Sequence, residues 1–179
     1  PQSVEESAVA GRLDLRDKVV ITIDGASSKD LDDAVSLERD GLGRWVLGVH
    51  IADVSHYVPA ASPLDLEAWE RGTSVYFADR VVPMLPPELS NGICSLNPRV
   101  DRLTLSCLMT LTAEGELVGH TIAKSVIRTV ERMTYDDCNA LLAGEEAALT
   151  QRYGAILPTL RDMAALAAVQ VGGQAVLGR

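Results

Sequence analysis

The alternation of apolar and polar side chains over residues 103–112 constrains the fold more than any other feature of the chain. Its apolar positions are Leu103, Leu105, Cys107, Met109 and Leu111. Serine and threonine occupy most positions between them, and Leu108 alone breaks the pattern. Because successive side chains of a strand point to opposite faces of a sheet, this period of two is typical of a half-buried strand. Glu114-Gly115 then predicts a turn into a second strand over 117–130.

Two further stretches predict strands nearer the amino end. The β-branched run over residues 19–23 is bounded by charged residues and by Asp24-Gly25, which is typical of a short buried strand. Residues 34–37 and 45–52 flank Asp40-Gly41-Leu42-Gly43, and we expect Asp40-Gly41 to supply the positive-φ residue of a tight hairpin. The chain therefore predicts antiparallel strand pairs.

Capping signals predict a short helix over residues 63–71. Ser62 offers a hydroxyl at the N-cap, proline follows at the first helical position, and Gly72 provides a stop. Residues 80–98 carry four prolines, so we expect mostly loop there, with at most one helical turn.

From Thr134 onward the pattern becomes helical, with Thr134 as a cap, Gly144 as a stop and an interruption at Pro158. We therefore expect an α+β fold with a mixed, mainly antiparallel β core and flanking helices. Residues 1–18 are expected to form a leading segment and residues 19–179 one domain. The chain ends within a helical pattern, without a cap or polar tail, and so we expect an incomplete domain.

Composition limits the function classes. The net charge of −9 counts against a nonspecific nucleic-acid coat, but a site that holds divalent cations needs carboxylates and is itself acidic. The three cysteines are far apart, never in a C-x-x-C pair, and fit neither a disulfide framework nor a zinc site. No apolar run of roughly 18 residues and no signal peptide is present, so we expect a cytoplasmic protein without membrane contact.

Four aspartates lie within ten residues, at Asp24, Asp30, Asp32 and Asp33. The first ends the predicted strand 19–23, and the others precede the next strand, so a turn between them can bring all four together. Magnesium prefers oxygen ligands, and two such ions about 3.5–4 Å apart can stabilise both the attacking and the leaving oxygen of a phosphodiester. A solvated acidic turn is the simpler alternative. Mutual repulsion beside buried strands favours a cation site, because Lys29 is the sole nearby compensating charge.

Other site chemistries find little support. An EF-hand loop that began at Asp30 would place Val35 at position six, where glycine is required, and Gly41 at position twelve, where an acid is required. No P-loop, G-x-G-x-x-G, H-E-x-x-H or G-x-S-x-G motif occurs. His50 and His56 lie either side of an aspartate and could form a base or ligand pair. A histidine in an apolar strand is more often a hydrogen-bonded core residue, which is the interpretation we favour.

Four segments, in order and spacing, resemble a known catalytic domain: TIDGASSKDLDDAVSLE, VHIADVSHYV, RGTSVYFADRVVPMLPPELSNGICSLNP and RLTLSCLMTL. Together they are similar to the RNB domain of the ribonuclease II / ribonuclease R family, and the ribonuclease R branch is the nearer match. The resemblance covers nearly all of residues 20–140. It implies a processive, hydrolytic 3′-to-5′ exoribonuclease that acts on single-stranded RNA and releases nucleoside 5′-monophosphates.

The resemblance also implies roles for individual residues. Asp24 and Asp33 would hold one Mg²⁺ or Mn²⁺ ion, and Asp30 and Asp32 would complete the cage for a second, with Asp32 the most sensitive to substitution. Tyr76 would stack on the 3′-terminal base of the RNA, although its apolar surroundings alone suggest a core tyrosine. The rest of the RNB domain and the OB-fold modules of the family are not in this sequence, so we expect the segment to be the amino-terminal part of that domain and incomplete for activity.

Two alternatives belong to other functional classes. One is a catalytically inactive, RNA-binding scaffold that keeps the fold. The intact aspartate quartet argues against it, because a scaffold has no need for four clustered acids. The other is a metal-dependent phosphohydrolase that acts on small phosphate esters. Its products would distinguish it from an exoribonuclease.

Overall fold

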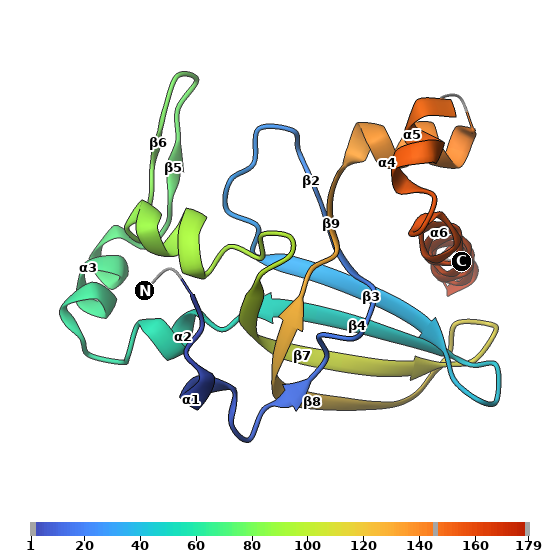
Figure 1. The fold of residues 1–179 in the computed structure, drawn as a ribbon, viewed down its shortest axis with the longest axis horizontal. Helices are drawn as coiled ribbons and strands as arrows, with labels where there is room; N and C mark the ends of the chain where they lie inside the picture. Colours follow the sequence, from blue (N-terminus) through green and yellow to red (C-terminus); the bar gives the residue numbers. More distant parts are fainter. Residues whose placement is uncertain (1–2, 145–146, 178–179) are drawn as a thin grey trace.

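The computed structural model describes residues 3–144 and 147–177 and is built on a seven-stranded sheet (Figure 1). In spatial order the strands are β1 (Leu13–Asp14), β8 (Leu117–Arg128), β7 (Asp101–Leu111), β4 (Trp45–Ala52), β3 (Asp33–Arg39), β2 (Val20–Asp24) and β9 (Glu131–Thr134). The outer pairs β1–β8 and β2–β9 are parallel, and the inner neighbours are antiparallel. The predicted mixed, mainly antiparallel core is confirmed.

Helices and a hairpin gather at the two ends of the sheet (Figure 1). One end carries α1 (Glu6–Val9), α2 (Val54–Tyr57), α3 (Pro63–Arg71), the strands β5 (Val75–Tyr76) and β6 (Val81–Val82), and the helical segment η1 (Glu88–Ile93). The other end carries α4 (Tyr135–Ala143), α5 (Ala147–Tyr153) and α6 (Leu157–Leu177). The α+β class is confirmed. In the described part of the chain, no helix has the length and apolar character to cross a membrane.

The capping residues act as predicted. The hydroxyl of Ser62 accepts a hydrogen bond from the backbone N–H three residues later, and Gly72 ends α3 in the left-handed region with φ 70°. Thr134 caps α4 in the same way, and Gly144 ends it with φ 73°. These hydroxyls satisfy backbone donors that a helix leaves free in its first turn. Both helix predictions are therefore confirmed.

Two details of the prediction were wrong, and the interruption at Pro158 was right. In the β3–β4 turn the positive-φ residue is Gly43, with φ 77°, and not Gly41. The Asp40 carboxylate accepts hydrogen bonds from the backbone N–H groups of Leu42 and Arg44, and the turn is therefore longer than the two-residue form. The interruption expected at Pro158 is present, because α5 ends at Tyr153 and α6 begins at Leu157, with Pro158 in its first turn, where a missing N–H costs nothing. Strand β8 ends at Arg128, two residues earlier than expected.

The leading segment is tied to the sheet. Leu13 and Asp14 form β1 beside β8, and Leu15 is buried in the core. Arg12 Nη2 lies 2.7 Å from Asp53 Oδ2, and both side chains are almost fully buried. A domain boundary at residue 18 stays a prediction, but these contacts join its two sides.

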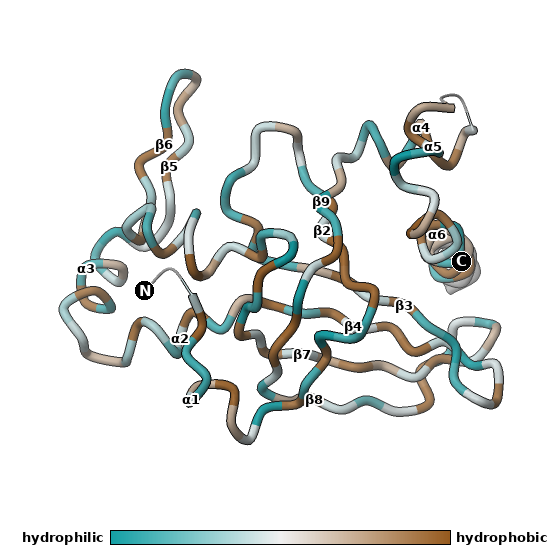
Figure 2. The backbone as a smooth tube through the Cα atoms, viewed as in Figure 1, coloured by the Kyte–Doolittle hydropathy of each residue, from teal (hydrophilic) through white to brown (hydrophobic). Residues whose placement is uncertain are grey.

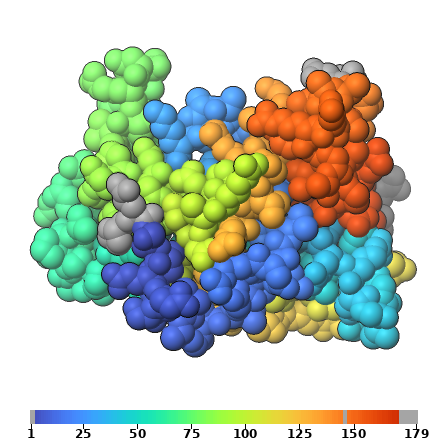
Figure 3. Space-filling model, in the orientation of Figure 1, coloured from blue at the N-terminus to red at the C-terminus, as the bar shows by residue number. Residues whose placement is uncertain are grey.

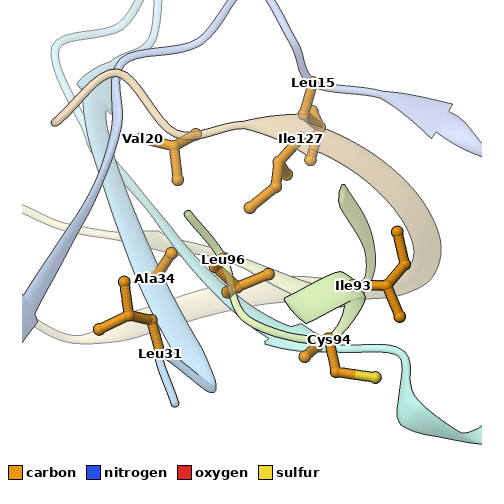
Figure 4. Close-up of a cluster of buried hydrophobic side chains, with 9 residues drawn as sticks. Leu15, Val20, Leu31, Ala34, Ile93, Cys94, Leu96 and Ile127 are labelled. Carbon is orange, nitrogen blue, oxygen red and sulfur yellow. The ribbon is translucent and has the colours of Figure 1, made fainter. Parts of the chain in front are cut away.

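Hydrophobic residues colour much of the crossing strands, whereas hydrophilic and neutral residues are frequent in the connecting loops (Figure 2). One buried cluster includes Leu31 from the loop between β2 and β3 (Figure 4); its members are Leu15, Val20, Leu31, Ala34, Ala52, Ile93, Cys94, Leu96 and Ile127. A second cluster joins β2 and β9 to helices α4–α6. The strands that carry the aspartates are therefore anchored on both faces of the sheet.

Candidate active site

The four aspartates lie at the junction of two neighbouring strands. Asp24 is the last residue of β2, and Asp33 is the first residue of β3. Asp30 and Asp32 lie on the loop between them. Because β2 and β3 are antiparallel neighbours, the end of one lies beside the start of the other. The topology therefore brings the predicted site residues to one end of the sheet.

The charges of the four carboxylates interact. Desolvation raises the pKa of Asp24, which is half-buried, and the negative charges of Asp33 and Asp30 raise it further; the nearby Arg132 guanidinium opposes this rise. Desolvation also raises the pKa of Asp32, together with repulsion from Asp30, Asp33 and Asp24. Each aspartate thus contributes to a shared region of negative potential.

This donor set suits a hard divalent cation, because all four groups offer carboxylate oxygens. Across residues 3–144 and 147–177, no group of three or more His, Cys, Asp or Glu side chains is close enough to hold an ion as it stands. Like charges repel when no cation lies between them, and a bound ion would relieve the repulsion that raises the two pKa values. The ligand roles of the individual aspartates stay predictions.

Arg132 supports the loop from one side. Its Nη2 atom donates to the carbonyls of Gly25, Ala26 and Ser28 at 3.4, 3.0 and 2.8 Å. Its Nε atom is buried and has no hydrogen-bond partner. Sequence reasoning missed Arg132, because it is more than 100 residues from the loop and no spacing rule links the two.

Tyr76 lies on the β5–β6 hairpin and faces the aspartates. It is 65% exposed, which excludes the core tyrosine that its apolar surroundings suggested. Its hydroxyl donates to Asp30 Oδ2 at 3.0 Å, and this bond raises the pKa of Tyr76. In the space-filling view, the β2–β3 loop (blue) lies between the projecting hairpin (pale green) and helices α4–α6 (orange) (Figure 3). An aromatic face is thus available to a ligand beside the carboxylates.

The two histidines do not join this site. His50 is fully buried, with Nδ1 2.6 Å from Ser106 Oγ and Nε2 3.0 Å from Ser36 Oγ. Burial lowers the pKa of His50 to about 4, so it is neutral at pH 7. The interpretation of His50 as a hydrogen-bonded core residue is confirmed. His56 is exposed and stacks edge-on against Tyr57.

Two hollows lie beside the described strands, and none of the four aspartates lines either of them. An apolar cavity of about 500 Å³ lies between the sheet and α6, and its lining of residues such as Leu37, Met109 and Leu166 carries no titratable group. A polar pocket of about 440 Å³ reaches the loop at Ala26 and is lined in part by Arg132. The apolar cavity offers no acid, base or nucleophile, so the aspartate loop is the better candidate for chemistry of the two.

Comparison with known proteins places the sequence in a family. The RNB domain model matches residues 12–170. Ribonuclease R 1 of Lactococcus lactis is 57% identical over 166 residues, which cover 93% of this chain and 20% of that protein. Ribonuclease R of Escherichia coli is 47% identical over 162 residues, which cover 90% of this chain and 20% of that protein. The chain thus spans about a fifth of the length of these relatives.

Solved structures of other proteins also resemble this chain. Mycoplasma genitalium RNase R, in complex with ribose methylated single-stranded RNA, has a TM-score of 0.84 and 32% identity, covering 93% of this chain and 26% of that one. Yeast Ssd1, a pseudonuclease, has a TM-score of 0.71 at 20% identity, which shows a common fold alone; the match covers 84% of this chain and 19% of that one. On the match to the family model and to the ribonuclease R relatives, this chain belongs to the RNB domain family.

Proposed function

We propose that this chain carries the catalytic aspartates of a ribonuclease R-type exoribonuclease. The enzyme hydrolyses single-stranded RNA processively from its 3′ end and releases nucleoside 5′-monophosphates. The observation that carries the proposal is the meeting of four mutually repelling aspartates with an exposed tyrosine at one end of an RNB-type sheet. The carboxylates offer ligands for cations, and the tyrosine offers a stacking surface for the terminal base.

We propose Mg²⁺ as the cofactor, with Asp24 and Asp33 as ligands of one ion and Asp30 and Asp32 as ligands of a second. When bound, such ions activate water and stabilise the developing charge on the leaving 3′-oxygen. The protein's own part is to hold the carboxylates in place. Asp24 and Asp33 are fixed by strands β2 and β3, and Asp30 and Asp32 by a loop that Arg132 supports.

Tyr76 supplies the proposed contact with the terminal base. Base stacking on an aromatic ring tolerates any sequence, because every base has a π-face, and this suits an enzyme that degrades RNA from its end. The RNase R of Mycoplasma genitalium has been solved with single-stranded and with double-stranded RNA, which supports RNA as the substrate of this chain. The exposure of Tyr76 leaves its ring free to stack.

Product analysis tests the proposal. The intact protein is incubated with Mg²⁺ and a single-stranded RNA labelled at its 5′ end or internally, and with adenosine monophosphate as a small ester. We expect nucleoside 5′-monophosphates from the RNA, no release of phosphate from the ester, and no reaction after chelation. Hydrolysis of the ester without RNA cleavage would instead identify a small-molecule phosphohydrolase. Tight RNA binding without cleavage would identify an inactive scaffold with the same fold.

We also propose the cytoplasm as the working compartment. All three cysteines are free, and Cys94 and Cys138 are buried, which is typical of a reducing compartment. Burial raises the pKa of both thiols to about 11, so neither forms a reactive thiolate near pH 7. Cell fractionation tests this assignment, and recovery of the protein outside the cytosolic fraction would contradict it.

A further inference from the structure

Ser95 bridges the two peptide groups that flank Asp30. Its hydroxyl donates to the carbonyl of Lys29 at 3.0 Å and accepts from the N–H of Leu31 at 3.0 Å. Ser95 is fully buried, and its bond with Leu31 is buried while its bond with Lys29 is partly buried. A single side chain thus fixes the backbone before and after one of the proposed metal ligands.

We call these two hydrogen bonds of Ser95, one on each side of Asp30, the bracket. Bonds of neighbouring residues extend it. The N–H of Leu96 donates to the carbonyl of Leu31 at 2.8 Å. The Leu31 and Leu96 side chains, 1% and 0% exposed, lie in the same apolar cluster (Figure 4). The N–H of Ala52 donates to the carbonyl of Asp32 at 2.9 Å. Residues 29–32 are therefore tied by backbone bonds and by one buried leucine, while the aspartate side chains remain at the surface.

Arg102 holds Ser95 in turn. Its guanidinium donates to the carbonyls of Ser95, Asp101 and Gly92 at 2.7, 2.9 and 3.2 Å. Arg102 is 6% exposed, and burial of a cation is costly unless hydrogen bonds satisfy its donors. Because these acceptors come from two segments of the chain, the guanidinium fixes the segment that carries Ser95 against β7.

We propose that Ser95, held by Arg102, is a positioning residue of the aspartate centre. It keeps Asp30 and Asp32 close to Asp24 and Asp33, although the four like charges push the loop outward. This inference rests on the proposed function, since it assigns the bracket to the same cation site. Residues that orient metal ligands commonly change metal affinity by about 10- to 100-fold when they are replaced.

The test compares two buried serines in the intact protein. Ser95→Ala removes the bracket. Ser125→Ala is the matched control, because Ser125 is also fully buried and its hydroxyl also donates to a backbone carbonyl, that of Thr104. Ser125 lies on β8, which β7 and β4 separate from β3. Ser95→Cys is slightly larger than serine and forms weaker hydrogen bonds, and it serves if Ser95→Ala does not fold.

Three quantities are measured: the Mn²⁺ dissociation constant by calorimetry, amide hydrogen exchange of the peptide that spans residues 25–34, and single-stranded RNA affinity without metal. We expect Ser95→Ala to weaken Mn²⁺ binding by about tenfold or more and to speed exchange of the loop amides. RNA affinity should change little, because it depends on contacts spread over many nucleotides. Ser95→Cys should show smaller shifts in the same direction. Ser125→Ala should leave Mn²⁺ affinity within about threefold of wild type, since distant sites couple weakly.

Unchanged Mn²⁺ affinity and unchanged loop exchange in the Ser95 variants would overturn the inference. Equal changes in Ser125→Ala would overturn it too, because the effect would then follow general stability. If the wild-type protein neither binds Mn²⁺ nor cleaves RNA, the proposed function fails. Amide hydrogen exchange of the loop then tests the role of Ser95 by itself. Faster exchange confined to the Ser95 variants supports that role, and unchanged exchange overturns it.

Discussion

Mild acid should destabilise the fold through His50. This side chain is fully buried between two serine hydroxyls on neighbouring strands, and burial lowers its pKa from 6.5 to about 4. The unfolded chain therefore binds a proton more readily than the folded protein between pH 6.5 and pH 4. Stability is complete above the unfolded pKa and falls as the pH drops through this window.

The size of the effect follows from the shift. At about 1.4 kcal/mol per pKa unit, the full depression corresponds to about 3 kcal/mol, of which about 2 kcal/mol is lost by pH 5. Carboxylates titrate at lower pH values and add their own pH dependence to the free energy of unfolding. A variant that lacks the imidazole is therefore needed to isolate the contribution of His50.

The assay is urea unfolding at pH 7 and pH 5 for the wild type and His50→Gln. Glutamine retains a donor and an acceptor for the two serines but does not titrate. We expect the wild type to lose about 2 kcal/mol more than the variant between the two pH values. Parallel losses in both proteins would refute the reasoning, because His50 would then titrate alike in the folded and unfolded states.

Other variants address the ion pair, the aromatic contact and the cation site. Asp53→Asn should lower the free energy of unfolding by about 3–5 kcal/mol because it leaves the buried Arg12 cation unpaired; a loss below about 1 kcal/mol, typical of exposed pairs, would contradict this. Tyr76→Ala should weaken binding of a single-stranded RNA by about tenfold or more, whereas Tyr76→Phe should bind nearly as well, because stacking needs only the ring; equal losses would point to the hydroxyl instead. Asp24→Asn and Asp33→Asn should each weaken Mg²⁺ or Mn²⁺ binding in calorimetric titrations, and unchanged binding would place the cation elsewhere.

Features set by neighbouring residues were predictable from the sequence. The caps Ser62 and Thr134 act within three residues of the groups that they satisfy, so composition and spacing identify them. The alternation over 103–112 predicted a strand that the structure contains as β7 (Asp101–Leu111). Burial does not follow the alternation, because Thr104 and Ser106 are buried and Leu105 is 46% exposed. The prediction placed the positive φ angle at Gly41, because several turns are compatible with Asp-Gly-Leu-Gly. Two backbone N–H groups bond to the Asp40 carboxylate and favour a turn in which Gly43 has the positive φ angle instead.

Supports of the aspartate loop were not predictable in this way. Ser95 and Arg132 reach the loop from 64 or more residues away, and only the three-dimensional pairing of the strands brings them there. Ser95 lies inside a motif that resembles the RNB family, yet that resemblance assigns it no role. The aspartates themselves were recognisable, because four acids beside buried strands are costly unless something requires them.

The central claim is that the aspartates perform the chemistry and do not hold the RNA. Asp32→Asn in the intact protein tests it most directly, with single-turnover cleavage and equilibrium binding measured on the same single-stranded RNA. We predict that cleavage is lost while binding is kept or slightly tightened, because the carboxylate acts where charge develops and its removal relieves repulsion with phosphate. Cleavage within about tenfold of wild type, a loss of only about 1.4 kcal/mol in transition-state stabilisation, would contradict the account. A parallel fall of binding and cleavage would also contradict it, and would make Asp32 a structural residue of the loop.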